Sequence, residues 1–388
     1  MATATPIDGL PTDVFVEILL RLPAINRWRL RLVCRYWHYV ILQRTPPVPE
    51  PMALAIVRVW RSRLVPAKAL YDDGGRTKHI DGSRPGMVGT CNGLLCLCDD
   101  MQPGGAIALL NPATGARLVV PPLPGSAQWV RCWGMGIRDW HEAYSFTCHP
   151  ETGRYTIVHV PCYSDRSGGF SELQVFTLGE PSWRDVPVPG ATCRISAGLV
   201  SIDGVTHWVT MDTERVVAFD LGEERVTSMR ELPVTGSERG DNYTWRLTEV
   251  HGRLGVVSSP SPRWRTLATT PEKIDVWVLE AGRDRRQGWS RRYSVQMGVR
   301  QVLAWPHFVH GDYILTKETY SNSVFAHRMP VAKCGEVRSM RITDRGRFVS
   351  GMSCYSMLGV FAYVKTDEPL SAYKSKRRAS KLLKLRRL

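Results

Sequence analysis

The sequence predicts an α+β multidomain protein in which a small helical unit is followed by a much larger all-β domain. Residues 12–41 carry apolar side chains at helical spacing, and residues 45–51 hold four prolines. From Met52 onward, short runs of Val, Ile, Leu and aromatic residues alternate with turns built on Gly, Pro, Asp and Asn, as in strands and hairpins. We expect the following domains: a helical unit at 7–44, a proline-rich linker at 45–51, the all-β domain at 52–368 and a basic tail at 369–388.

The first helix is predicted to begin after Thr12, a residue type that caps helices well, and Asp13 places a carboxylate in the positive first turn. Pro23 ends the helical pattern, because proline lacks the N–H that a helix interior needs. The apolar residues at helical spacing are Val14, Phe15, Ile18, Leu19 and Leu22.

A second amphipathic helix is predicted, and its apolar stripe consists of Leu30, Val33, Cys34, Trp37 and Ile41. The two helices together span only about 35 residues, below the roughly 40 at which a chain usually needs outside help to fold. Another protein or the next domain must therefore cover part of their apolar surface.

The helical unit resembles the F-box, a short module that docks onto a Skp-type linker protein of cullin-based ubiquitin ligases. The matching positions are Leu10-Pro11, Asp13, Glu17-Ile18-Leu19, Arg21-Leu22-Pro23, Leu30-Arg31, Val33-Cys34-Arg35, Trp37 and Ile41. The sequence departs from the family at residues 26–28 and at Tyr36, where the family usually has a short polar residue. The resemblance implies linker contacts by Leu10, Pro11, Val14, Ile18, Leu19, Leu22, Pro23, Leu30, Val33, Cys34 and Trp37. The alternative is an ordinary amphipathic helical pair that packs on its own domain.

The all-β domain contains a repeat. A turn residue followed by glycine precedes a strand-like run five times, at Gly93, Gly153, Gly204, Gly252 and Gly311, with gaps of 60, 51, 48 and 59 residues. Each period holds a second hairpin, with its glycine at 115, 179, 222, 282 or 335. About four strands per period is typical of a β-propeller blade of kelch size. A β-sandwich is the alternative, but it does not predict the recurring period.

Six blades are favoured, because strands at 53–60 and 347–364 are left over beside the five blades that can be counted directly. Pairing the first strand with the last removes the exposed edges of an open array, so we expect Val57 to lie beside a strand of the 347–364 region. Motifs between residues 86 and 300 resemble the F-box-associated domain that is common in plant F-box proteins, among them IDVWVL at 274–279.

Signatures of catalysis and of ligand binding are missing from the sequence, which has no GxxxxGK[ST], GxGxxG, HExxH or GxSxG motif. We therefore expect no catalytic residue and no cofactor. A zinc site is an alternative, since thiolates and imidazole suit zinc; its ligands would be Cys91, Cys96 and Cys98, with Cys132, Cys148 and His149 downstream. However, Cys96 and Cys98 lie two apart on a probable strand and so share one face, where small cysteines pack in a core. We expect no metal site.

Seven of the thirteen tryptophans form two groups. Trp183, Trp208, Trp277 and Trp289 recur inside the repeated hairpins, which favours packing between blades. The candidates for a target-binding surface are Trp129, Trp133 and Trp140, which fit the repeat less well; core packing is the alternative.

The net charge of +15 is concentrated at the C-terminus, where the last fifteen residues contribute +8 and no acid. The tail contains Lys376, Arg377, Arg378, Lys381, Lys384, Arg386 and Arg387. Such a run is a nuclear-import signal, a phosphate-binding arm or simply a solvated extension. The ten scattered cysteines suit a reducing compartment, and no apolar stretch reaches the length of a membrane span, so we expect a soluble protein of the nucleus or cytoplasm.

The resemblance implies a non-catalytic substrate receptor of a Skp–cullin–F-box ubiquitin ligase. Its partners are a Skp-type linker, through it a cullin, and a protein target that the sequence does not identify. We expect no membrane partner, and nucleic acid is not favoured. Two alternatives remain: a propeller that binds nucleic acid or phospholipid through the basic tail, and a propeller glycosidase, for which acid clusters are rare here.

Overall fold

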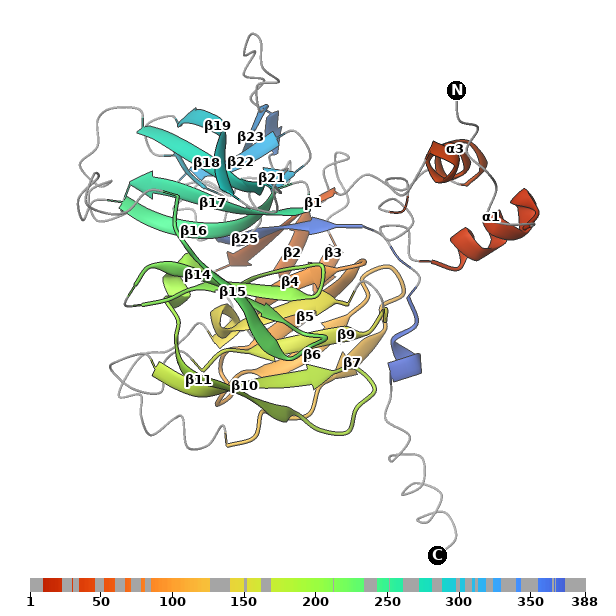
Figure 1. Ribbon diagram of the computed structural model, residues 1–388, viewed down its shortest axis with the longest axis horizontal. Helices are drawn as coiled ribbons and strands as arrows, with labels where there is room; N and C mark the ends of the chain where they lie inside the picture. The colour runs from red at the N-terminus through yellow and green to blue at the C-terminus, as the bar shows by residue number, and fades with distance from the viewer. Residues whose placement is uncertain are drawn as a thin grey trace, which may run out of the picture.

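The structure, a computed structural model, places two short helices at one side of a large β domain (Figure 1). The residues that it describes are 10–22, 30, 35–45, 52–59, 67–70, 78–80, 85–125, 140–149, 152–161, 169–211, 213–233, 243–250, 252–260, 272–280, 288–297, 301–303, 309–310, 313–318, 324–328, 340–342, 355–364, 366 and 368–373.

The helices α1 (Thr12–Leu20) and α3 (Arg35–Arg44) pack against each other through a small apolar core. Four residues of this core are buried, namely Phe15, Leu19, Val40 and Ile41. In α1 the two buried side chains are four residues apart, which places them on one face of the helix. The amphipathic pattern of the sequence therefore corresponds to a real helical pair.

The start of α1 differs from the prediction that Thr12 is the cap. Pro11 is the N-cap residue and accepts a 3.0 Å hydrogen bond from the N–H of Phe15. Thr12 is the first helical residue, and its hydroxyl shares a 3.0 Å hydrogen bond with the hydroxyl of Tyr36. The ring of Tyr36 also stacks on Phe15, with centroids 5.8 Å apart. The tyrosine that departs from the family pattern therefore ties α3 to the start of α1.

The strands form six antiparallel sheets among the described residues, and within a sheet each strand pairs mainly with its neighbours in sequence. The β4–β7 sheet has β4 (Pro85–Cys91), β5 (Leu94–Asp99), β6 (Ala106–Leu110) and β7 (Arg117–Val119). The β8–β11 sheet has β8 (Tyr144–Cys148), β9 (Tyr155–His159), β10 (Gly169–Thr177) and β11 (Arg184–Thr192). The β12–β15 sheet has β12 (Val200–Ile202), β13 (Val205–Val209), β14 (Arg215–Asp220) and β15 (Arg225–Glu231).

The remaining sheets follow the same plan with one variation. The β16–β19 sheet has β16 (Tyr243–Val250), β17 (Arg253–Pro260), β18 (Glu272–Glu280) and β19 (Gly288–Met297). The β20–β24 sheet has β20 (Gln301–Leu303), β21 (Val309–His310), β22 (Tyr313–Glu318), β23 (Val324–Arg328) and β24 (Met340–Ile342), and both β20 and β21 pair with β22. The closing sheet has β1 (Met52–Val59), β2 (Ala67–Leu70), β3 (Lys78–Ile80) and β25 (Tyr355–Tyr363), in the order β25-β1-β2-β3.

The repeat read from the sequence corresponds to this plan. The first glycine of each period lies between the first two paired strands of a sheet, as Gly93 does between β4 and β5. Asn92 and Gly93 both have positive φ, 47° and 78°, and so do Asp203 and Gly204, at 50° and 80°. Two central residues with positive φ are what a tight turn matched to the strand twist requires. The glycines of the second series, such as Gly222, lie between the third and fourth strands.

The first and last strands of the domain pair with each other, as predicted. β1 and β25 run antiparallel over eight residue pairs, with Val57 opposite Met357. Their sheet therefore joins residues from both ends of the β domain, and β1 is covered on both edges by β25 and β2. The first strand of the domain therefore has no unpaired edge.

The sheets are arranged side by side around a common centre, in a propeller-like way (Figure 1). The first strands of neighbouring sheets contact one another in order, from β25 through β4, β8, β12 and β16 to β21. One such junction carries a hydrogen bond of 2.6 Å between the hydroxyls of Ser145 and Ser201. Apolar clusters fill the spaces between adjacent sheets, and one cluster joins Cys96 and Cys98 of β5 to Tyr155 and Trp183 of the next sheet.

The segment after β25 packs onto the β4–β7 sheet, although the sequence analysis places its last residues in the basic tail. The side-chain amide of Asn111 donates to the carbonyl oxygens of Thr366 and Glu368, at 3.1 and 3.0 Å. The short helix η5 (Leu370–Tyr373) follows, and Leu370 is buried in the apolar cluster of that sheet. Burial of Leu370 attaches this segment to the β domain.

The core holds a neutral histidine, which makes the stability of the fold dependent on pH. His159 is fully buried, and its Nδ1 lies 2.9 Å from Oε1 of Gln174. The amide of Gln174 donates to Asp185 at 3.3 Å, so its oxygen faces His159 and accepts from the Nδ1–H. Burial lowers the pKa of His159 to about 3, and burial also lowers the pKa of His207 to about 4.

We expect the free energy of unfolding to fall as the pH drops below 6.5. The unfolded chain then takes up protons on His159 and His207, whereas the folded protein does not bind them until about pH 3 and 4. The loss is about 1.4 kcal/mol per pH unit for each histidine. Urea unfolding at pH 7, 6 and 5 measures it, and His159→Gln should have a shallower pH dependence than the native protein. If the free energy of unfolding depends on pH equally in both proteins, His159 is not a source of the pH dependence.

Candidate protein-binding sites

The outward face of α1 is the first candidate site. Val14 and Ile18 are 45% and 47% exposed, and they lie one helical turn apart on the same side of the helix. Phe15 and Leu19 face α3, so the helix cannot turn the exposed pair inward without giving up its core. Two branched apolar side chains side by side in solvent, on so small a unit, mark a surface suited to a protein partner.

The other predicted linker-binding residues take different places. Leu19 is fully buried between the helices, so it stabilises the helical pair and offers no surface to a partner. Helical spacing alone could not separate it from Ile18, its neighbour in the apolar run. Pro11 is exposed, and three residues, Leu10, Leu22 and Leu30, are partly buried against the helical core.

Trp37 is also partly buried, and its ring packs edge-on against Phe15 at a centroid distance of 4.8 Å. Pro23, Val33 and Cys34 lie outside the described residues.

The predicted target-binding tryptophans are not brought together in the described part of the chain. Trp129 and Trp133 lie outside it, and Trp140 is only 5% exposed. Trp140 opens the short helix η1 (Trp140–Ala143), which is held by Asp100: its carboxylate accepts from the backbone N–H of His141 at 2.9 Å and lies 2.8 Å from the ring nitrogen. For Trp140 the structure therefore favours the alternative of core packing.

Three of the four recurrent tryptophans, Trp183, Trp208 and Trp289, pack between sheets, as predicted for inter-blade contacts. Trp183 and Trp208 are buried, at 7% and 0% exposure. The indole N–H of Trp183 donates to the carbonyl oxygen of Pro121 at 2.8 Å, and that of Trp289 donates to Glu231 at 2.8 Å. Each of these bonds connects one sheet with the sheet before it. Trp277 is partly buried and lies under the guanidinium of Arg291.

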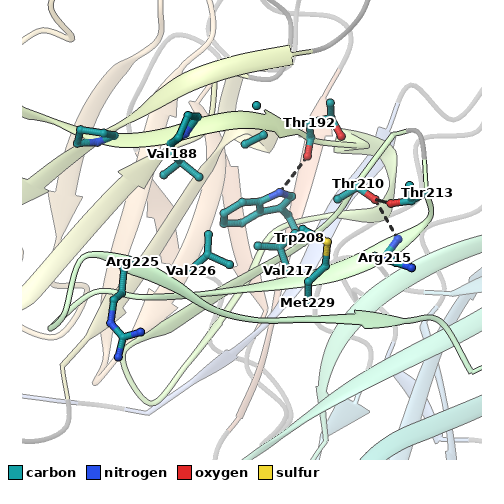
Figure 2. A pocket seen from close by; sticks show the side chains of 14 residues that line it. Val188, Thr192, Trp208, Thr210, Thr213, Arg215, Val217, Arg225, Val226 and Met229 are labelled. Carbon is teal, nitrogen blue, oxygen red and sulfur yellow. Dashed lines mark hydrogen bonds between the residues drawn. The ribbon is translucent and has the colours of Figure 1, made fainter.

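A pocket of about 510 Å³ forms the second candidate site. It lies between β11 of one sheet and strands β13–β15 of the next (Figure 2). Val188 and Val217 contribute apolar walls, and Trp208 lies between them, its indole N–H donating to the carbonyl oxygen of Thr192 at 3.0 Å. Val226 and Met229, on the outer strand β15, are exposed by 37% and 52%.

The polar groups of the pocket are arranged at its rim. Thr210 accepts a hydrogen bond from the backbone N–H of Arg215 at 2.9 Å and shares one of 2.9 Å with Thr213. The guanidinium groups of Arg215 and Arg225 carry the charge of the site and are more than 40% exposed. The pocket thus combines an apolar interior with a rim that carries two arginines, each paired with a glutamate. Sequence reasoning did not find it, although one signal was present: the hairpin from 221 to 232 lacks the tryptophan that its neighbours carry.

Two of the cysteines considered for a zinc site lie in the core of the β domain. Cys96 and Cys98 are fully buried in the core, and burial raises the pKa of both thiols well above its usual value. Among the described residues, no group of three or more His, Cys, Asp or Glu side chains could hold a metal ion. No helix in the described ranges is long and apolar enough to cross a membrane. The basic tail from Lys376 to Arg387 lies outside those ranges.

Comparison with protein families finds two matches along the chain. Residues 7–46 match the model of the F-box domain. Residues 76–326 match the model of the F-box associated beta propeller domain. The first match covers the helical unit with the exposed face of α1, and the second covers the sheets that form the pocket.

Comparison with individual proteins gives relatives of the same kind. An F-box/kelch-repeat protein of Arabidopsis thaliana is 24% identical over 315 residues, which are 76% of this chain and 69% of that protein. An F-box protein of the same plant is 24% identical over 347 residues, 78% of this chain and 77% of that protein. A chain in the crystal structure of a nidogen/laminin complex is similar in structure, with a TM-score of 0.45 and 12% sequence identity. The match covers 81% of this chain and 99% of that chain.

Proposed function

The chain belongs to the F-box proteins that carry an F-box-associated β-propeller domain, and from this membership we propose that it is the substrate-recognition subunit of a Skp–cullin–F-box ubiquitin ligase. An F-box implies a Skp-type partner, and proteins of this family are typically adaptors without catalysis of their own. The F-box binds the linker, and through it a cullin. The propeller binds a target protein.

The observation that carries this proposal is the exposed apolar face of α1 within the matched F-box. Val14 and Ile18 are nearly half exposed, and the core of this helical unit consists of only four buried side chains among the described residues. A linker that covers this face removes apolar surface from water and stabilises the helical pair at the same time. Leu10, Pro11, Leu22, Leu30 and Trp37 border the same unit and extend the proposed contact. Pro23, Val33 and Cys34 complete the set that the family resemblance implies.

The proposed receptor acts by proximity. Ubiquitin transfer is the work of a separate enzyme, and the receptor raises the concentration of its target near the transfer site. This role needs two binding surfaces held on one chain, and it needs no nucleophile or metal. It also suits a protein of the nucleus or the cytoplasm, where ubiquitin ligases of this type work.

A propeller of six blades is part of this proposal. Its support is the six sheets of the described residues together with the pairing of β1 and β25. Propellers present loops on two faces while the blades stay rigid, which is how one fold serves many targets. Trp129 and Trp133, which lie outside the described residues, remain candidates for target recognition.

Affinity purification with mass spectrometry tests the proposed function. The tagged full-length protein should recover a Skp-type linker and a cullin, together with the target. A variant with Val14→Ser and Ile18→Ser should lose the linker and the cullin but keep the target. Recovery of neither linker nor cullin by the native protein would contradict the proposal.

The basic tail gives a separate prediction. Deleting residues 374–388 should leave folding and linker binding unchanged, because the deletion keeps every described element of the β domain, including η5, which ends at Tyr373. Eight positive charges without an acid attract acidic partners over about one Debye length, near 8 Å at physiological salt. We therefore expect the deletion to remove nuclear enrichment of a fluorescent fusion or salt-sensitive retention on a nucleic-acid column. No change in either measurement would leave the tail a solvated extension.

A further inference from the structure

Two of the described junctions between sheets contain a tryptophan, on either side of the β12–β15 sheet, and its position is set by the hairpin of the outer strands. Trp183 comes directly before β11, and its ring lies 5.4 Å from that of Phe176 on β10. Its N–H bonds to Pro121, just beyond β7 of the preceding sheet. In the β16–β19 sheet, Trp289 of β19 pairs with Leu279 of β18 and bonds in the same way to the preceding sheet.

The β12–β15 sheet has valine in this position. Phe219 corresponds to Phe176, because each lies in a Phe-X-Leu-Gly turn at the end of the third strand. Val226 is the residue of β15 that pairs with Phe219, so it stands where Trp183 stands in the β8–β11 sheet. Val226 is 37% exposed, whereas Trp183 is 7% exposed. The pocket lies directly beside Val226, where the neighbouring junctions carry an indole.

The tryptophan that does reach this junction comes from deeper in the sheet. Trp208 belongs to β13, the second strand, and it bonds to Thr192 at the end of β11. It fills the inner part of the junction and is fully buried. The outer part, between β11 and β15, stays open, and Figure 2 shows Val226 beside the edge of the Trp208 ring.

The wall facing Val226 contains a residue that corresponds to Glu231, the hydrogen-bond acceptor of Trp289. The carbonyl oxygen of Glu231 accepts the hydrogen bond from Trp289. Glu231 pairs with Arg215, which lies five positions before Asp220. Pro187 pairs with Glu172, which lies five positions before Thr177, the counterpart of Asp220. Pro187 lines the pocket. An indole bound beside Val226 therefore lies against Pro187, at the strand position that corresponds to Glu231 in the junction with Trp289.

The rim determines the charge of the ligand. Arg215 and Arg225 line the pocket, and their partners Glu231 and Glu223 are 69% and 55% exposed, at 3.4 and 2.5 Å. Exposed pairs of this kind contribute little to stability, so carboxylates of a ligand can replace them at small cost.

We propose that the pocket between β11 and β15 binds a tryptophan side chain presented by an acidic segment of the target protein. The bound indole takes the place that Trp183 and Trp289 occupy at the neighbouring junctions, and the arginines at the rim bind the flanking carboxylates. This inference rests on the proposed function, because it assigns part of target recognition to one site on the propeller.

Titration calorimetry with the full-length protein tests the site. The probe is a blocked pentapeptide, Asp-Glu-Trp-Asp-Glu, and its counterpart with alanine in the centre serves as the peptide control. We expect saturable binding of the first peptide and none of the second. Val226→Trp should reproduce the packing of the two neighbouring junctions, keep or raise the melting temperature, and weaken peptide binding at least about tenfold. The matched control is Val119→Trp, on an exposed position of β7, which should bind like the native protein.

A charge-reversal variant tests the rim without touching the interior. Arg225→Glu should weaken binding of the acidic peptide and strengthen binding of a Lys-Lys-Trp-Lys-Lys peptide. Equal binding by Val226→Trp and the native protein, or no binding by the native protein, would overturn the proposal. Linker co-purification, measured on the same variants, reports on the proposed function separately: it should be unchanged by all of them, and its absence in the native protein would point to failure of the F-box assignment instead.

Discussion

Replacing Val14 and Ile18 together by serine is expected to abolish co-purification of a Skp-type linker while the β domain stays folded. The two side chains are nearly half exposed, so a linker that covers them gains about 1 kcal/mol from each. Buried serine hydroxyls without partners add a further cost of about 1 to 3 kcal/mol each. The combined loss of about 4 kcal/mol corresponds to roughly a thousandfold in affinity, beyond what a pull-down detects for a micromolar pair.

Leu20→Ser is the matched control for that experiment. Leu20 is 40% exposed and belongs to the same helix, but it lies on a different side from Val14 and Ile18. Linker binding should persist in this variant. The thermal melt of the β domain should be the same for all three proteins. Undiminished linker recovery by the double variant would contradict the assignment of this face.

Ending the chain near Arg345 is expected to leave an aggregated protein. The shortened chain lacks β25, so β1 loses eight paired residues and becomes an exposed edge. It also loses three deeply buried side chains, Phe361, Tyr363 and Leu370, each worth about 1.5 to 3 kcal/mol. Their sum is comparable to the whole stability of an ordinary domain, about 5 to 15 kcal/mol.

The chain that ends after Tyr373 is the control for this truncation, because it keeps both β25 and η5. It should be soluble and melt cooperatively, as measured by size-exclusion chromatography and calorimetry. A soluble monomer with a cooperative melt from the shorter chain would show that the pairing of β1 with β25 does not hold the domain together.

The β architecture was largely predictable because its signals are local and repeated. The Asn92-Gly93 and Asp203-Gly204 dipeptides require backbone conformations that few other residues adopt, so they locate the hairpins directly. The pairing of Val57 with the last strand was predictable because one strand was left over at each end of the domain, and pairing them removes two exposed sheet edges. The packing of Trp183 followed from its recurrence in the hairpins, and the burial of Cys96 followed from strand alternation.

The positions that the sequence could not place depend on tertiary contacts. The apolar run of α1 is wide enough that spacing does not tell which side faces α3, so Leu19 and Ile18 looked alike. Trp140 is buried because Asp100 holds η1 against the core, a contact between residues about forty positions apart. The pocket is defined by a missing side chain at Val226, which becomes visible only when the register of three sheets is known.

The pairing of β1 with β25 has a consequence for synthesis of the protein. Met52 and Tyr363 are partners, yet about 300 residues separate them along the chain. At about 5 to 20 residues per second, β1 waits roughly 15 to 60 seconds for its neighbour to be made. During that interval the strand presents unpaired N–H and C=O groups to every nascent chain nearby, at the stage when contacts of long sequence separation cannot yet form. The pairing of β1 with β25 therefore comes only after almost the whole β domain has been made, and until then the free edge of β1 is a place where other chains can associate.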